Sequence, residues 1–202
     1  MDLAPLLALV KADFDKVDAL IDDCLYSEIP LISELARHLI DSGGKRLRPL
    51  IALLSAKAFN YSGDGHLQLA ASLELLHTAT FLRDDVIDGS LLRRGKKTAN
   101  NLWGNSASVL VGDFLYSRAF QLITQINNSR VLASLANATN ILSQSEILQL
   151  LSCHNTNIDE TYCLKIIQGK TGTLFSIAAE QAAILSHRTE EEISAMANYG
   201  LH

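Results

Sequence analysis

The sequence predicts an all-α fold, and three observations lead to this prediction. Apolar residues make up 48% of the 202-residue chain, while glycine (11) and proline (3) are scarce, which is typical of long helices with short connections. Apolar side chains recur at helical spacing along most of the chain. No segment shows the sustained apolar–polar alternation of a strand. The length suits one domain with a sizeable core.

Four helices are expected in the first half of the chain, from apolar periodicity and from proline and glycine near their ends. Their approximate ranges are 2–24, 30–42, 50–59 and 66–88. Pro30 and Pro49 suit first helical turns because proline has a fixed φ and needs no hydrogen-bond acceptor there. Gly43 and Gly44 end the second helix.

The second half begins with a loop and a short helix or turn, and longer helices follow. The expected ranges are 89–95 for the loop, 96–104 for the short element, and 106–127, 130–153, 160–185 and 189–202 for the helices. Ser106 or Ser108 can cap the first of these helices. Thr189 and Glu192 form a capping box. Two glycines within 169–172 weaken the helix expected over 160–185 and are expected to interrupt it.

Charge and composition exclude several classes of protein. The formal net charge of -5 gives no reason to expect a nucleic-acid partner. No apolar run approaches the ~18–20 residues of a membrane span, and no signal peptide is recognisable. The cysteines Cys24, Cys153 and Cys163 are odd in number and form no CxxC. A disulfide framework is therefore not expected, and a cytoplasmic location is.

The central helix ends in a cluster of acidic residues that needs an explanation. Residues 67–82 are apolar on nearly all sides, which predicts a buried helix. Asp84, Asp85 and Asp88 then follow at the C-terminal end, where the helix dipole disfavours anions. Asp84 and Asp88 project from one face, and carboxylates at this spacing suit Mg²⁺. The alternative is an acidic helix end neutralised by the arginines just downstream.

Basic residues gather in three places. Residues 43–49 put three cations in a glycine-containing turn before a helix, an arrangement that suits phosphate binding. Residues 91–96 form a second basic turn, and Lys170 with Thr171 lies where the helix is weakened. Each has an ordinary alternative: a solvated turn, a surface salt-bridge loop and a snorkelling lysine. His77 taken alone is better explained as a core histidine.

These segments together resemble the trans-prenyl diphosphate synthase family, and within it most closely the bacterial octaprenyl diphosphate synthases. The matching segments lie in order along the chain: GGKRLRP (43–49), LLHTATFLRDDVIDGS (75–90), RRGKKTAN (93–100), VGDFLYSRAF (111–120) and KTGTLF (170–175).

The resemblance implies an isoprenoid-synthase-type helical bundle with a central apolar cavity. It also implies Mg²⁺-dependent, head-to-tail addition of isopentenyl diphosphate to an allylic prenyl diphosphate by a homodimer. The expected product is a long, octaprenyl-like diphosphate for quinone side chains.

Functional residues carry over from the family by position. Those implied for isopentenyl diphosphate are Lys45, Arg48, His77 and Arg94. Those implied at the allylic diphosphate are Arg93, Lys170 and Thr171. The metal ligands are Asp84 and Asp88, with Asp85 supporting the site. The family limits product length with the side chains one turn before the first aspartate, here Ala79 and Thr80. Neither is a bulky aromatic residue, which favours a long product.

The chain departs from the family pattern in several places. Arg83 replaces a usual histidine, Gly89 replaces a common glutamate, and Ser145 precedes Glu146 where the family often has Gly-Glu. The chain also ends at 199–202, before the family's second aspartate-rich motif. Residues 1–202 are therefore expected to be the N-terminal part of one synthase domain without its last helices, with weak Mg²⁺-diphosphate binding and little turnover alone. The alternative is a non-catalytic subunit that associates with a full-length synthase.

Overall fold

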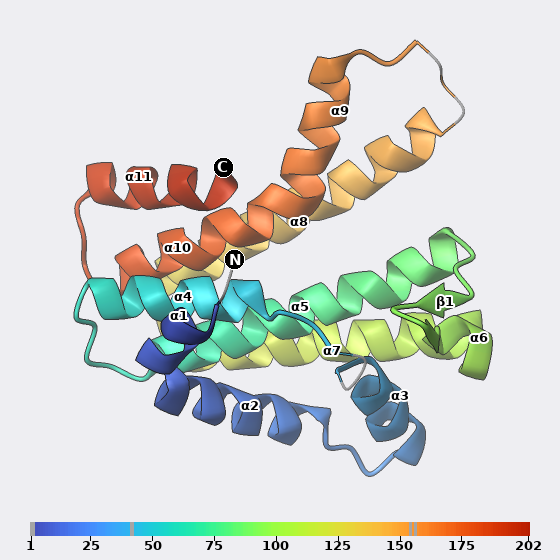
Figure 1. Ribbon diagram of the computed structural model, residues 1–202, viewed down its shortest axis with the longest axis horizontal. Helices are drawn as coiled ribbons and strands as arrows, with labels where there is room; N and C mark the ends of the chain where they lie inside the picture. Colours follow the sequence, from blue (N-terminus) through green and yellow to red (C-terminus); the bar gives the residue numbers. More distant parts are fainter. Residues whose placement is uncertain (1–2, 41–42, 154, 156) are drawn as a thin grey trace.

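The computed structural model describes residues 3–40, 43–153, 155 and 157–202, and within these ranges the chain is a bundle of α-helices (Figure 1). The helices are α1 (Ala4–Leu9), α2 (Lys11–Leu25), α3 (Pro30–Ile40), α4 (Leu47–Ala58), α5 (Gly65–Ile87), α6 (Ala99–Trp103), α7 (Asn105–Gln125), α8 (Ser129–Ser152), α9 (Glu160–Ile167), the π-helix η1 (Gln168–Gly172), α10 (Thr173–Leu185) and α11 (Glu190–Leu201). The predicted all-α fold class is confirmed.

Helix α5 forms the centre of the bundle. The helices α2, α4, α7 and α10 all pack against it, and Figure 1 shows α5 and α7 running side by side. Leucines and alanines on every side of α5 are buried, among them Leu69, Leu73, Leu76 and Leu82. Burial of such side chains is the main stabilising contribution in a helical bundle. In the part of the chain described, no helix has both the length and the apolarity needed to cross a bilayer.

Several predicted helix ends are wrong by a few residues. The helix expected over 2–24 is two helices, because the backbone leaves helical geometry at Val10 and the Val10 N–H bonds to the carbonyl of Leu7. Helix α4, which was expected to begin near Leu50, begins at Leu47, so that Pro49 lies inside its first turn. Gly104, rather than Ser106 or Ser108, precedes α7. The capping box of Thr189 and Glu192 is confirmed.

A short antiparallel hairpin follows α5 and was not predicted. Its strands are β1 (Leu92–Arg93) and β2 (Lys96–Lys97), in the register Leu92 to Lys97 and Arg93 to Lys96. The two loop residues, Arg94 and Gly95, both have positive φ (51° and 78°), as a two-residue type I′ loop requires. Strands of two residues are too short to show alternation. The signal that remained in the sequence was the glycine after Arg94.

The weakened helix expected near residues 169–172 is confirmed as the π-helical segment η1, between α9 and α10. An added Cβ at Gly169 would lie 1.8 Å from Ser145 Oγ, so only glycine permits this approach to α8. Ser145 stands where the family often has glycine, and its side chain is accommodated because the residue facing it is Gly169. Segments of π-helix are frequent at functional sites.

Candidate functional site

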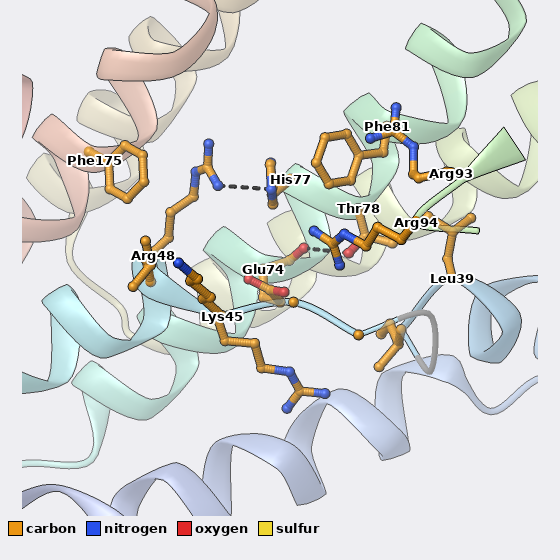
Figure 2. A pocket seen from close by; sticks show the side chains of 15 residues that line it. Leu39, Lys45, Arg48, Glu74, His77, Thr78, Phe81, Arg93, Arg94 and Phe175 are labelled. Carbon is orange, nitrogen blue, oxygen red and sulfur yellow. Dashed lines mark hydrogen bonds between the residues drawn. The ribbon is translucent and has the colours of Figure 1, made fainter. Parts of the chain in front are cut away.

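Cationic side chains from three separate segments line one cavity of about 560 Å³ (Figure 2). The cations come from the loop before α4, from the first turn of α4 and from the hairpin. They are Lys45, Arg46, Arg48, Arg93 and Arg94. The predicted His77 lies on the wall contributed by α5, and Leu39, Phe81 and Phe175 supply apolar surface. A cavity with five cations and apolar walls can hold an anionic group attached to a small hydrocarbon.

The loop before α4 is fixed by its own contacts. Arg46 has a left-handed backbone (φ 45°) and forms an ion pair with Asp18 of α2. This ion pair holds the loop in place. Lys45 and Arg48, which are close to Arg46 in the sequence, line the cavity. An added Cβ at Gly44 would lie 3.0 Å from Arg94 Nη1, so the glycine leaves room for the Arg94 guanidinium over the loop.

Arg48 and His77 form a hydrogen-bonded pair in the cavity wall. Arg48 Nη1 donates to His77 Nε2 over 2.8 Å, which requires a neutral imidazole with its proton on Nδ1. Burial, followed by the charge of Arg48, lowers the pKa of His77 to about 3. Burial also lowers the pKa of Arg48 to about 10, so the guanidinium stays charged at neutral pH. The Cζ atom of Arg48 lies 4.4 Å from the centre of the Phe175 ring.

The lowered pKa of His77 predicts a pH-dependent stability. Between the folded pKa of about 3 and an unfolded pKa near 6.5, the unfolded chain binds more protons. Stability therefore falls as the pH falls below about 6.5, with His77 contributing about 1 kcal/mol per pH unit. We expect His77→Gln to lose less stability than the unchanged protein between pH 6.5 and 4.5, in urea unfolding at several pH values. His202→Gln, at an exposed position, should follow the unchanged protein, and identical curves for all three proteins would contradict the prediction.

Glu74 is an acidic residue on the same cavity wall and was missed from the sequence. It lies one helical turn before His77 on α5 and faces the cations (Figure 2). Burial raises the pKa of Glu74, and the charges of Arg46, Arg48 and Arg94 oppose that rise. The available signal was its spacing, because residues three apart on a helix share a face.

The acidic cluster at the end of α5 divides between two tasks. Asp84 is almost buried and accepts a hydrogen bond from Lys170 Nζ at 3.0 Å. Asp88 is exposed one turn later, and both aspartates line a small cavity of about 30 Å³ with Glu146, Gln149 and Lys170. The pKa of Asp84 is raised overall, because the effect of burial outweighs the opposing effect of the hydrogen bond from Lys170.

Asp85 pairs with a different cation from the one that pairs with Asp84. Its carboxylate is 2% exposed and accepts bonds from Arg93 Nη2 at 2.8 Å and from Arg93 Nε at 3.1 and 3.2 Å. The Arg93 guanidinium also lies 4.2 Å from the centre of the Phe81 ring. Asp85 therefore anchors an arginine of the cation-lined cavity.

The carboxylates of Asp84 and Asp88 fit a divalent cation that takes its remaining ligands from water and from a diphosphate. Within the described ranges, no three His, Cys, Asp or Glu side chains come close enough to enclose a metal ion by themselves. Mg²⁺ commonly binds through one or two carboxylates plus substrate phosphates. An acidic pair beside the ammonium of Lys170 is suited to hold a metal diphosphate.

The remaining predicted residues lie outside the two cavities described so far. Thr171 is exposed and lines a second large hollow of about 500 Å³, together with Ile51, Phe175 and Leu201. Ala79 is completely buried in the core. Thr80 is partly buried, and its hydroxyl donates to the carbonyl of His77 over 2.8 Å.

Comparison with known proteins gives a consistent result. A family model described as polyprenyl synthetase matches residues 29–202. The octaprenyl diphosphate synthase of Escherichia coli is 43% identical over 99% of the chain and 62% of its own length. The all-trans-nonaprenyl-diphosphate synthase (geranyl-diphosphate specific) of Rhodobacter capsulatus is 43% identical over 92% of the chain and 57% of its own length.

Two solved structures share the fold, each with a TM-score of 0.96. One is the polyprenyl synthase of Caulobacter crescentus complexed with calcium and isoprenyl diphosphate, at 43% identity over 99% of this chain and 61% of that one. The other is a decaprenyl diphosphate synthase from Rhodobacter capsulatus, at 44% identity over 98% of this chain and 62% of that one. The chain thus spans about three fifths of the length of these relatives.

Proposed function

The chain belongs to the polyprenyl synthetase family, and from this membership we propose that it carries two diphosphate-binding sites of a long-chain trans-prenyl diphosphate synthase. The reaction would add isopentenyl diphosphate head to tail to an allylic prenyl diphosphate. The relatives named above make products of octaprenyl, nonaprenyl and decaprenyl length. That range supports a long product, and we propose one of octaprenyl-like length.

The observation that carries the proposal is the pairing of two different anion sites along α5. Around His77 the cavity offers cations without a carboxylate pair, which suits a diphosphate bound directly by arginine and lysine. Two turns later, Asp84 and Asp88 lie beside Lys170, which suits a diphosphate bound through a divalent cation. Two diphosphates held differently on one helix are what a condensation of this kind requires.

Each group has a defined task in this proposal. Mg²⁺ at Asp84 and Asp88 would supply positive charge that stabilises the departing diphosphate. Lys170 would donate a hydrogen bond to the same diphosphate as its charge develops. Arg93, which lines the cation-lined cavity and whose charge reaches Asp84, would donate to this diphosphate from that side. Lys45, Arg48 and Arg94 would hold isopentenyl diphosphate and orient it, while neutral His77 would offer its Nδ1 proton. The apolar core beneath α5 would keep water from the reacting carbons.

The proposal is tested by binding and by turnover. We expect isothermal titration calorimetry on the 202-residue chain to show one inorganic diphosphate bound without metal, at the cation-lined cavity, and a second bound only when Mg²⁺ is present, at Asp84 and Asp88. In the full-length protein, we expect Mg²⁺-dependent incorporation of radiolabelled isopentenyl diphosphate into a long prenyl chain. Absence of the Mg²⁺-dependent binding step, or of diphosphate binding altogether, would contradict the synthase proposal. If the chain bound no diphosphate but altered the rate of a full-length synthase, it would instead be a non-catalytic subunit.

Product length provides a separate test of the chain-length residues. Replacing Ala79 with Phe in the full-length protein is expected to shorten the product, because the family limits product length with the side chains one turn before the first aspartate and a bulky ring there would stop chain growth sooner. Chromatography of dephosphorylated products measures this length, and an unchanged distribution would refute the assignment. Ala79 is completely buried, so overpacking is expected to cost about 1–3 kcal/mol. Thr80→Phe, at a partly buried position, provides a second variant with less demand on the core.

A further inference from the structure

We propose that Gln149 of α8 is a positioning residue for the proposed reaction, which holds the ammonium of Lys170 beside the Asp84–Asp88 pair. This inference rests on the proposed function, because it concerns the diphosphate that Lys170 would contact. Gln149 is assigned no role by the family resemblance described above. It is identified by its contact with Lys170.

The geometry places the lysine between two helices. Lys170 Nζ donates to Gln149 Oε1 of α8 at 3.0 Å and lies 3.0 Å from Asp84 Oδ2 of α5. All three side chains line the same small cavity. A lysine side chain has many rotamers and a freely rotating ammonium. Two acceptors on different helices restrict that freedom and leave one of the three ammonium protons for a ligand.

The backbone around Lys170 brings it within reach of Gln149. Lys170 lies in η1, and the next residue back, Gly169, contacts α8 at Ser145. Ser145 and Gln149 are four residues apart, so they lie on the same face of α8. The close approach at Gly169 therefore sets the separation between η1 and the part of α8 that carries Gln149. The Ser145 hydroxyl is occupied by its bond to the carbonyl of Ile141 at 2.8 Å.

A neutral acceptor is the suitable group at position 149. The small cavity already contains the carboxylates of Asp84, Asp88 and Glu146. A fourth carboxylate would repel an incoming diphosphate, whereas an apolar side chain would leave Lys170 with Asp84 as its acceptor in this cavity. A cation binding to Asp84 competes with Lys170 for the carboxylate. Gln149 keeps the displaced ammonium at the edge of the site, where it can contact the diphosphate.

A double-mutant cycle tests whether Gln149 acts through Lys170. The variants are Gln149→Leu, Lys170→Met and the combination, in the 202-residue chain. The measured quantity is the affinity for inorganic diphosphate at saturating Mg²⁺, by isothermal titration calorimetry. We expect Gln149→Leu to weaken binding by about 5- to 10-fold in the unchanged chain. In the Lys170→Met background the same substitution should change the affinity less than about 2-fold.

Gln144→Leu serves as the matched control, because Gln144 is exposed on the same helix, and it should leave the affinity unchanged. Gln149→Glu should also weaken diphosphate binding, through its added negative charge. Equal losses in both backgrounds would overturn the positioning role, since they would show a general effect on the fold. No loss in either background would overturn it as well. Failure of the unchanged chain to bind diphosphate with Mg²⁺ would instead overturn the proposed function and this inference with it.

Discussion

Replacing Asp84 with asparagine is expected to weaken Mg²⁺-dependent binding of inorganic diphosphate by about 100-fold. The substitution keeps the size of the side chain but removes the charge that a hard cation requires. It also leaves Lys170, which is now 3.0 Å from a carboxylate oxygen, facing a neutral amide. Hydrogen bonds to charged groups contribute about 1.5–3 kcal/mol each, and a lost metal–carboxylate contact of similar strength would weaken binding by about 100-fold. Calorimetric titration with and without Mg²⁺ measures it.

The matched control is Asp113→Asn. Asp113 is also an aspartate paired with a cation, with its Oδ1 2.7 Å from Arg83 Nη2, but it belongs to α7 and its side chain is 56% exposed. We expect this control to bind diphosphate as tightly as the unchanged chain. Equal weakening by both substitutions would show that net charge, rather than metal ligation at Asp84, governs binding.

The parts of the fold that were predicted correctly are those whose geometry is determined by neighbouring residues. Thr189 and Glu192 satisfy each other's backbone groups three residues apart, so the start of α11 follows from local chemistry. The two glycines in 169–172 lower helix propensity wherever they occur, and the structure has a π-helix there. The break at Val10 carries neither glycine nor proline and could not be located in this way.

The parts of the site that were missed depend on contacts between distant segments. Asp84 and Asp88 were predicted to hold the metal and Asp85 to support the site, but their cationic partners were not predicted: Asp84 faces Lys170 and Asp85 faces Arg93. Which carboxylate faces which cation depends on the path of the hairpin and of η1, and neither path follows from local periodicity. The Gln149–Lys170 contact spans 21 positions. Spacing along one helix was therefore enough to select the candidate metal ligands on α5, whereas their cationic partners required the three-dimensional packing.

The different environments of Asp85 and Asp88 predict unequal effects of their substitution on the free energy of unfolding. Asp85→Ala is expected to lower the free energy of unfolding by about 3 kcal/mol, because it removes a buried carboxylate that accepts three hydrogen-bond contacts from Arg93. Removing one partner of a buried ion pair leaves the other charge uncompensated, and typical costs are about 3–5 kcal/mol. The Arg93 side chain is 27% exposed, so water offsets part of the cost and the lower end of that range applies.

Asp88→Ala is the control, since Asp88 is exposed at the end of the same helix and surface substitutions usually change stability by less than about 0.5 kcal/mol. Urea unfolding followed by circular dichroism measures both values. The same two variants should rank the other way in Mg²⁺ binding, because Asp88 would be a metal ligand and Asp85 acts through Arg93. A stability loss at Asp88 as large as that at Asp85 would contradict the division of tasks, since it would mean that both aspartates hold the fold together.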